Sequence, residues 1–210
     1  MVLADFKLQQ SLEGSYAVSS YVYNSYSKAV DVKRTGWVEL DIPDPESIVE
    51  HMYNTWLLGM LNLPESHCAE GYDKARILSM IMVHDLGETV TGDIPKPKKK
   101  GRPEYDDDED RVMNELFLKG TYPDMPNLKE YFELWNEWYE QITINSRIAK
   151  DLDLLQAMYQ FCTYYTKYPD KFSDERRESW LNEHRDIKTE LGLQIYARII
   201  KDNPQFRHLF

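Results

Sequence analysis

One stretch, residues 77–95, constrains the chain most, because a run of apolar residues leads directly into a cluster of acids. Residues 77–83 are nearly all apolar and are followed by His84 and Asp85, then by Glu88 and Asp93. The apolar run predicts a buried helix, so the acids at its end should be buried or nearly so. A buried carboxylate is costly without a partner, and the usual remedy is a cation, often a metal ion. The rest of the chain must then supply further metal ligands.

The composition is that of a globular, acidic protein. The chain has 210 residues, of which 42% are hydrophobic, so it can build a sizeable core in one large domain or two small ones. Its formal net charge of −11 argues against general binding to nucleic acid polymers or to a membrane surface. An anionic substrate stays compatible with this charge, because a metal ion and a few local cations can reverse the field inside one pocket.

No segment of the sequence predicts secretion or membrane insertion. Cys68 and Cys162 do not have the spacing of a zinc site, so they predict ordinary thiols in a reducing compartment. No apolar stretch approaches the roughly 20 residues of a membrane span, and the N-terminus lacks the apolar core of a signal peptide. We therefore expect an intracellular protein of the cytoplasm, with a nuclear location also open.

Helical spacing of apolar residues accounts for nearly the whole chain. It predicts helices over about 5–30, 45–61, 73–85, 106–119, 127–143, 146–168 and 174–201. The expected N-caps are Asp44, Asp73 and Ser146, whereas residues 33–40 predict a turn and a short extended piece. With no repeat and no clear linker, the chain predicts an all-α fold in a single domain over 1–210.

His51 lies in the second predicted helix, beside the apolar stripe that contains Ile48 and Met52. A lone histidine in such a position is more often a satisfied core side chain than a metal ligand. This segment alone leaves both interpretations open. Ligation becomes the stronger interpretation when other apolar helices supply further ligands.

Two acids in the predicted helix 146–168 compete as a further ligand. Asp151 and Asp153 lie two residues apart, so they project roughly 200° apart around a helix and only one can face the core. Asp151 follows Arg147 by one turn, a pair typical of a solvated face. Asp153 has Ala149 and Ala157 one turn away on either side, which leaves room beside its carboxylate. Asp153 is the better candidate ligand, and a structural carboxylate bonded to a buried tyrosine is the alternative.

Four residues on three predicted helices could therefore form a metal site: His51, His84, Asp85 and Asp153. Two imidazoles and two carboxylates suit a borderline or hard divalent ion such as Mn²⁺, Fe²⁺, Co²⁺, Mg²⁺ or Zn²⁺. One or two coordination positions would remain for water and a substrate oxygen. Such an ion can lower the pKa of bound water and polarise a phosphoryl group.

The acids that follow the predicted metal ligands suit proton transfer and substrate contact. Glu88 lies one helical turn after His84, near enough to exchange protons with an attacking water or a leaving group. Asp93 follows a glycine and could orient water or bind a sugar hydroxyl. Lys96 begins a lysine-rich run that precedes the acids of 104–110. This run is typical of a solvated loop whose halves attract each other, and the alternative is that lysines such as Lys96 draw phosphate into the pocket.

The ordered set of His51, His84-Asp85 and Asp153 resembles the HD-domain metal-dependent phosphohydrolases. Three longer stretches narrow the resemblance, namely Arg34-Thr35-Gly36-Trp37, residues 46–53 and residues 84–95. They are similar to the 5′-deoxynucleotidase branch, of YfbR type and its eukaryotic HD-domain-containing-2 relatives. The resemblance covers about residues 30–165 and is looser after residue 100, so these residues would form an HD-domain core on which the terminal helices pack.

The resemblance implies an all-helical bundle that hydrolyses deoxyribonucleoside 5′-monophosphates to the nucleoside and phosphate. It places the metal ligands on the four residues above, the catalytic acid/base on Glu88 and a nearby acidic partner on Asp93. It also implies that Arg34 contacts the phosphate and that Trp37 packs against the nucleoside, although Thr35 and Gly36 separate this pair, which is adjacent in the bacterial enzymes. Family members are typically homodimers, and the aromatic helix at 127–143 could support one.

Two other functions remain open at this point. Some relatives remove phosphates from nucleoside triphosphates, and the lysine-rich run after Asp93 could favour a longer phosphate chain. A non-catalytic HD module that binds a nucleotide or a partner is a different class of protein. In such a module we would expect a metal ligand or Glu88 to be lost, and all of them are present here.

Overall fold

The predicted all-α fold is confirmed. The computed structural model describes residues 27–64, 71–94, 111–113 and 128–209, and within these ranges it contains helices, turns and one isolated β-bridge, between Lys33 and Ser47. Lys96 and most of the predicted helices at 5–30 and 106–119 lie outside these ranges. None of the helices in the described ranges is long and apolar enough to cross a membrane.

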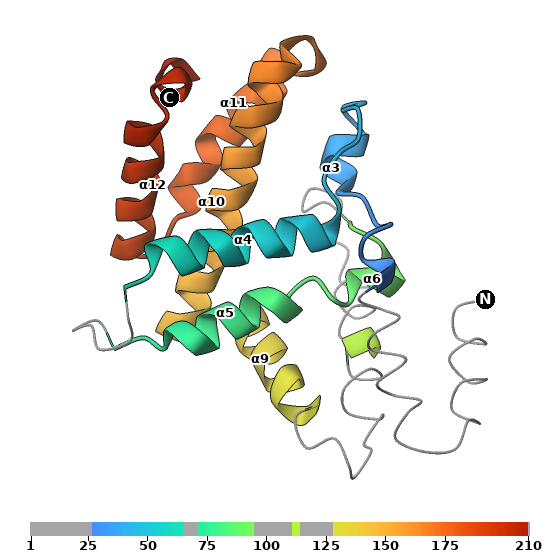
Figure 1. The fold of residues 1–210 in the computed structure, drawn as a ribbon, viewed down its shortest axis with the longest axis vertical. Helices are drawn as coiled ribbons and strands as arrows, with labels where there is room; N and C mark the ends of the chain where they lie inside the picture. The colour runs from blue at the N-terminus through green and yellow to red at the C-terminus, as the bar shows by residue number, and fades with distance from the viewer. Residues whose placement is uncertain (1–26, 65–70, 95–110, 114–127, 210) are drawn as a thin grey trace.

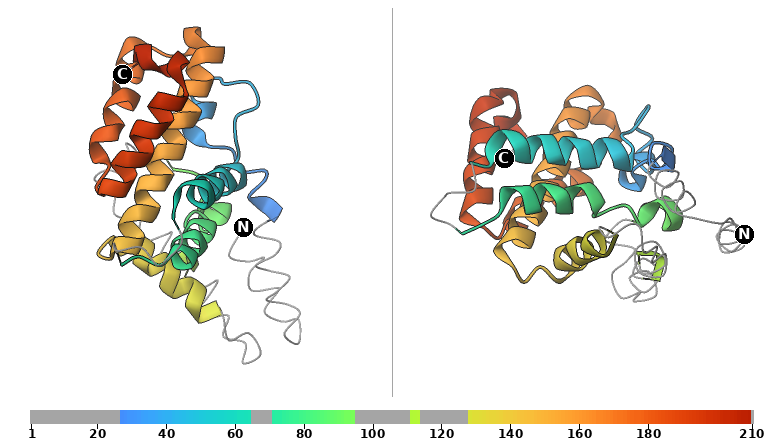
Figure 2. Two further views of the ribbon diagram at one scale, coloured as in Figure 1. Left: turned by 60° about the vertical axis from the view of Figure 1, so that its left-hand side comes forward. Right: turned by 60° about the horizontal axis from the view of Figure 1, so that its bottom comes forward.

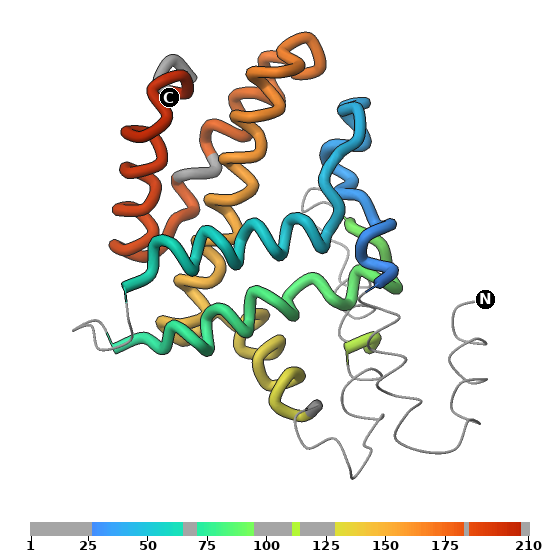
Figure 3. Tube along the Cα trace, viewed as in Figure 1, coloured from blue at the N-terminus to red at the C-terminus, as the bar shows by residue number. Residues whose placement is uncertain are grey.

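One long helix, α10 (Ile144–Lys167), is the element on which the others pack (Figure 1). It contacts α4 (Ile48–Asn62), α5 (Lys74–Val83), α9 (Leu128–Glu140) and α12 (Glu190–Asp202). The trace in Figure 3 shows α4 and α5 side by side and running in opposite directions across α10. The two views of Figure 2 show α12 alongside α10. The helices that carry the predicted ligands, α4, α5 and α10, therefore all contact one another.

Two apolar clusters hold these helices together. The larger one joins α5, α9 and α10, and its fully buried side chains include Ile77, Met80 and Leu152. The smaller one surrounds Trp37, whose ring stacks on Trp180 with 4.7 Å between ring centroids. The larger cluster fixes the end of α5, which leads into His84, whereas the smaller one fixes the segment that contains Arg34.

The start of α4 differs from the prediction. Ser47, not Asp44, is the N-cap: its side chain accepts a hydrogen bond from the Glu50 backbone N–H, and the Glu50 carboxylate accepts one from the Ser47 N–H. This reciprocal capping box satisfies two backbone donors, whereas a lone aspartate would satisfy one. Asp44 instead lies in the preceding turn in a left-handed conformation, with φ of 50°.

The other two predicted caps have different outcomes. Asp73 caps α5 as expected, because its side chain accepts a hydrogen bond from the Arg76 backbone N–H. Ser146 does not cap α10: Thr143 is the N-cap, and Ser146 completes a capping box as the third residue of the helix. The capping box was recognised from the sequence neither at α4 nor at α10, since several side chains that can cap a helix stand close together before each of them.

Two predicted backbone conformations are also wrong. Residues 35–38 form a short helix, α3 (Thr35–Val38), and not an extended piece, because the Trp37 and Val38 N–H groups turn back to the Arg34 carbonyl. The single helix predicted at 174–201 is divided into α11 (Asp174–Asn182), a 3₁₀ turn and α12. The break lies where Thr189 caps α12.

Asp151 explains this break and corrects a further prediction. It is 2% exposed rather than paired with Arg147 on a solvated face. Its carboxylate accepts hydrogen bonds from the Lys188 N–H at 2.9 Å, the Thr189 N–H at 2.8 Å and the Thr189 hydroxyl at 2.6 Å. Asp151 thus anchors the start of α12 on the side of α10 away from Asp153, an arrangement that a local i,i+4 argument could not reveal.

Replacing Asp151 by alanine is expected to destabilise the protein without changing its activity per folded molecule. The substitution leaves two backbone N–H groups without their acceptor, a loss of about 1–3 kcal/mol in the free energy of unfolding. Urea denaturation of Asp151→Ala measures this loss, and Asp170→Ala, which removes an exposed carboxylate, is the matched control. Equal stability of the two variants would contradict the anchoring role.

Candidate metal centre

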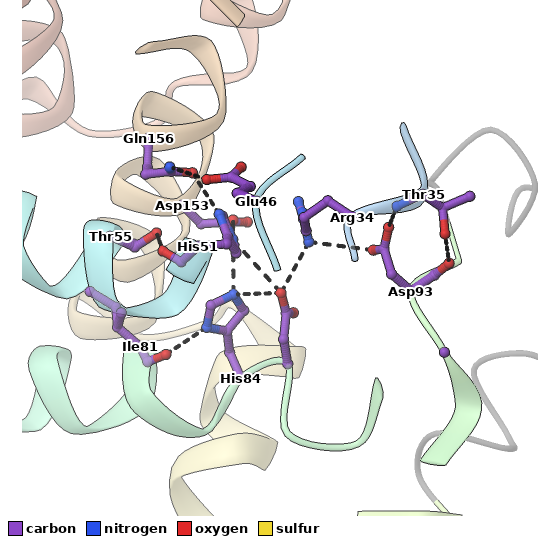
Figure 4. A network of polar contacts seen from close by, with 12 residues as sticks. Arg34, Thr35, Glu46, His51, Thr55, Ile81, His84, Asp93, Asp153 and Gln156 are labelled. Atoms are coloured by element: carbon purple, nitrogen blue, oxygen red, sulfur yellow. Dashed lines mark hydrogen bonds and ion pairs between the residues drawn. The ribbon is translucent and has the colours of Figure 1, made fainter. Parts of the chain in front are cut away.

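The residues predicted as ligands converge where α4, α5 and α10 meet (Figure 4). One ligand atom from each of His51, His84 and Asp85 lies within 4.8 Å of the other two. The Asp153 Oδ1 atom lies 2.9 Å from His51 Nε2 and 3.9 Å from His84 Nε2. His51 comes from α4 and Asp153 from α10, while His84 and Asp85 follow the last residue of α5.

All four side chains are buried. His51 is 0% exposed, His84 1%, Asp153 8% and Asp85 9%. Burying two carboxylates in one place is unfavourable unless positive charge accompanies them. The two imidazoles can carry that charge as protons, or they can help the carboxylates to bind a cation.

His84 has the proton arrangement that a metal ligand needs. Its Nδ1 lies 2.7 Å from the Ile81 carbonyl oxygen, which can only accept, so Nδ1 carries the proton. In the neutral ring this leaves a lone pair on Nε2, the nitrogen that faces Asp85 at 3.2 Å. Nε2 is buried and has no hydrogen-bond partner within the described ranges. A buried ring nitrogen with a free lone pair beside two carboxylates is a suitable set of donors for a divalent cation.

The pKa shifts show how strongly this cluster attracts positive charge. Burial disfavours the charged form of His84, but the carboxylates of Asp85 and Asp153 outweigh it and raise the pKa of the imidazole. Burial alone would raise the pKa of Asp85, yet His84, Arg34 and His51 together hold it well below its usual range. The pKa of Asp153 is lowered in the same way, by Lys150 and both histidines against the effect of burial.

Lys150 and Trp138 flank the cluster and were missed by the sequence reasoning. The Lys150 ammonium lies 2.9 Å from the Asp153 Oδ2 atom and 4.3 Å from the Trp138 ring centroid. The Trp138 ring also packs on His84, with 4.3 Å between centroids. The i,i+3 spacing of Lys150 and Asp153 was a signal for this ion pair. It leaves Asp153 Oδ1, the atom that faces the histidines, available to the centre.

Arg34 lies between the cluster and Asp93 (Figure 4). Its Nη1 donates to Asp85 Oδ2 at 3.1 Å and to Asp93 Oδ1 at 3.4 Å. Burial opposes the charge of the guanidinium, but Asp85 and Asp93 outweigh it and raise the pKa of Arg34. Arg34 therefore presents a permanent positive charge at the edge of the buried cluster.

Asp93 holds the segment that carries Arg34. Its carboxylate accepts a hydrogen bond from the Thr35 backbone N–H, and its carbonyl accepts one from the Thr35 hydroxyl at 2.6 Å. Asp93 reaches this position because Gly92 has φ of 79° and ψ of 160°, a backbone conformation essentially restricted to glycine. The predicted contacts of Asp93 with water or a sugar hydroxyl stay predictions, whereas its protein contacts position Arg34.

Glu88 begins α6 (Glu88–Thr91), three residues after Asp85, and is 5% exposed. Its charge contributes, after those of Asp85 and Asp93, to raising the pKa of Arg34. The predicted part of Glu88 in proton exchange stays a prediction.

Trp37 has a more enclosed position than predicted. Its ring is 2% exposed, stacks on Trp180 and meets the edge of Tyr164. Its indole N–H donates to Glu46 at 3.0 Å. The contact with a nucleoside stays a prediction that this enclosed ring does not support, because Trp180 covers one face. Sequence reasoning missed this because Trp180 is remote in the chain.

Comparisons with known proteins agree on one family. A family model of the HD domain matches residues 27–193. The 5′-deoxynucleotidase HDDC2 of Dictyostelium discoideum is 34% identical over 142 residues, which cover 65% of this chain and 72% of that protein. The HDDC2 protein of Xenopus laevis is 31% identical over 146 residues, 68% of each chain. The 5′-deoxynucleotidase YGK1 of Saccharomyces cerevisiae is 26% identical over 175 residues, 83% of this chain and 78% of its own.

Solved structures share the fold. A conserved hypothetical protein from Pyrococcus furiosus superposes with a TM-score of 0.67 at 23% identity, over 86% of this chain and 96% of that one. A predicted metal-dependent phosphohydrolase from Magnetospirillum magnetotacticum superposes with a TM-score of 0.64 at 22% identity, over 93% of this chain and 95% of that one. The similarity in fold therefore covers more of the chain than the stretches that carry recognisable sequence motifs.

Proposed function

The chain belongs to the HD domain family, and from this premise we propose that it is a metal-dependent 5′-deoxynucleotidase. The reaction would convert deoxyribonucleoside 5′-monophosphates to the deoxynucleoside and phosphate. One observation carries the proposal: two buried imidazoles and two buried carboxylates converge beside an arginine that can bind phosphate. The relatives named 5′-deoxynucleotidases support the choice of substrate.

We propose that His51, His84, Asp85 and Asp153 hold one divalent ion, drawn from Mn²⁺, Co²⁺, Mg²⁺, Fe²⁺ and Zn²⁺. Both histidines direct Nε2 toward the carboxylates, and this mixed nitrogen and oxygen donor set suits these ions. When bound, such an ion would act as a Lewis acid that lowers the pKa of water and polarises a phosphoryl oxygen.

Arg34 binds the substrate phosphate in this proposal. Its guanidinium is fixed by Asp85 and Asp93, and it has further N–H groups with which to donate to phosphate oxygens. Asp93 acts mainly by holding Arg34 and Thr35 in place. Because the guanidinium is already oriented, little side-chain entropy is lost when phosphate binds.

Glu88 moves the proton in this proposal. Its carboxylate accepts a proton from the attacking water and returns one to the 5′-oxygen of the leaving deoxynucleoside. The buried position limits contact with bulk water, which would otherwise compete for that proton. Lys96 stays a predicted phosphate contact outside the described residues, and the homodimer also stays a prediction.

The aromatic helix contributes less to a predicted dimer contact than the sequence indicated. Phe132, Trp135 and Trp138 of α9 are buried within the chain's own core, whereas Tyr131 and Tyr139 are exposed. The two tyrosines are the part of this helix that a second copy could contact.

A phosphate-release panel tests the proposed function. We expect phosphate release from dAMP with at least one of Mn²⁺, Co²⁺ or Mg²⁺, loss of activity with chelator, and recovery when the ion is returned. Release of pyrophosphate or triphosphate from dATP with dAMP untouched would overturn the monophosphatase assignment in favour of a triphosphate phosphohydrolase. No release from any nucleotide in a metal-loaded sample would indicate a non-catalytic module.

A further inference from the structure

We propose that Glu46 and Gln156 form a positioning relay that fixes the proton of His51 on Nδ1 and thereby directs its Nε2 to the metal centre. This inference rests on the proposed function in one respect, namely that His51 binds a metal ion. The relay is a chain of three hydrogen bonds that runs from Trp37 through Glu46 and Gln156 to His51 (Figure 4 shows the last three residues). Neither is a predicted metal ligand: Gln156 acts through His51, and Glu46 acts through Gln156, so both are positioning residues.

The contacts of the relay are short and buried. The Trp37 indole N–H donates to Glu46 Oε1 at 3.0 Å, and the Gln156 amide Nε2 donates to Glu46 Oε2 at 3.0 Å. The Gln156 Oε1 atom lies 2.5 Å from His51 Nδ1. Glu46 is 6% exposed and Gln156 5%, so water has little access to replace these partners. Leaving any of these buried groups unsatisfied would be unfavourable.

The chemistry of the partners fixes the direction of every hydrogen bond. An indole nitrogen can only donate, and both oxygens of Glu46 accept, so the amide of Gln156 must turn its NH₂ group toward Glu46. Its carbonyl oxygen then faces His51, which must donate from Nδ1. The opposite orientation of the amide would set its oxygen against a carboxylate oxygen. The carboxylate of Glu46 thus determines the tautomer of a histidine that it does not touch.

The result matches the arrangement at His84. There a backbone carbonyl accepts from Nδ1, and here a side-chain carbonyl does so. Both rings therefore present Nε2 to the same centre, where Asp153 Oδ1 lies 2.9 Å from His51. Partners behind a ligating histidine fix its orientation and raise its basicity, and their removal typically lowers metal affinity about 10- to 100-fold.

Glu46 also links the relay to the segment that carries Arg34. Its backbone carbonyl accepts from the Arg34 N–H at 3.0 Å, and its own N–H donates to the Tyr164 hydroxyl at 2.9 Å. One residue therefore positions both the backbone of the proposed phosphate-binding arginine and, through Gln156, a proposed metal ligand. The buried carboxylate of Glu46 thus has two hydrogen-bond partners, Trp37 and Gln156, and through them it takes part in this arrangement.

Three variants test the relay. Gln156→Met keeps the length of the side chain and removes its hydrogen bonds. Gln156→Glu combined with Glu46→Gln exchanges the two groups and preserves every bond, because the amide at position 46 then donates to the carboxylate at position 156, which accepts from His51. Gln194→Met, on the exposed surface of α12, is the matched control. Circular dichroism verifies that each variant is folded.

Two measurements give the outcome. Titration of the metal-free protein with Co²⁺, followed by its absorption spectrum, should show affinity reduced roughly 10- to 100-fold in Gln156→Met, unchanged in Gln194→Met and largely restored in the exchanged pair. Nitrogen-15 NMR of the imidazole rings in the metal-free wild-type protein should show the proton of His51 on Nδ1, and a loss of this preference in Gln156→Met.

The relay and the proposed function can fail separately. Wild-type affinity for Co²⁺ in Gln156→Met, or a wild-type His51 that carries its proton on Nε2, would overturn the relay. If the wild-type protein binds no divalent ion at all, the proposed function fails, while the NMR measurement still decides whether the relay sets the tautomer.

Discussion

Replacing His84 by alanine is expected to abolish metal retention and to reduce the proposed deoxynucleotidase activity to background. His84 is 1% exposed, and its Nε2 lies 3.2 Å from Asp85 and 3.9 Å from Asp153. The variant would keep only one of the two imidazoles beside these carboxylates, that of His51. The loss should exceed that of Asp153→Ala, which removes one oxygen donor and weakens retention. Metal content after gel filtration, measured by atomic emission, is the direct test.

The control for this experiment is Asp151→Asn. Asp151 is as buried as the predicted ligands and lies on the same helix as Asp153, but its partners are Lys188 and Thr189. This variant should lose stability and keep its metal. Full metal occupancy in His84→Ala would contradict the ligand assignment. Loss of metal in His84→Ala but not in Asp151→Asn would separate ligation from a general loss of stability.

Replacing Glu88 by glutamine is expected to lower kcat by roughly 10²- to 10⁴-fold while the metal stays bound. The amide keeps the volume of the buried side chain but cannot accept a proton from water or return one to the leaving group. KM should change little, since Arg34 and not Glu88 binds the phosphate in the proposed mechanism. Steady-state kinetics with dAMP and metal analysis of the same sample separate these effects.

Glu140→Gln is the matched control for the Glu88 variant, because Glu140 is exposed at the end of α9. It should turn over at the wild-type rate. Wild-type turnover in Glu88→Gln would show that another group exchanges the proton, and loss of metal in that variant would instead place Glu88 among the ligands.

The sequence predicted the parts of the fold and the site that depend on local pattern. The apolar residues before His84 and around His51 and Asp153 indicated which helix faces are buried, and the structure brings those three faces together. The roles of the converging residues remain predictions for the experiments above. The N-cap of α5 at Asp73 could likewise be predicted, because one aspartate precedes the apolar run.

Contacts between distant segments were not predictable in this way. Asp151 was placed on a solvated face because its partners, Lys188 and Thr189, are more than thirty residues away in the chain. Gln156 had no local signal either, since its polar partners Glu46 and His51 precede it by 110 and 105 residues in the chain. At α4 the sequence predicted Asp44 as the cap, and the reciprocal hydrogen bonds between Ser47 and Glu50 place the cap three residues later.

The two aspartates of α10 have a practical consequence for engineering this protein. Asp151 holds α12 on one side of the helix, and Asp153 faces the histidines on the other. Because the two sides share a backbone but no hydrogen-bond partner among those described, substitutions near the Thr189 contact can be selected for heat tolerance independently of substrate preference. A library confined to that side would change thermal stability without altering the residues of the candidate metal centre.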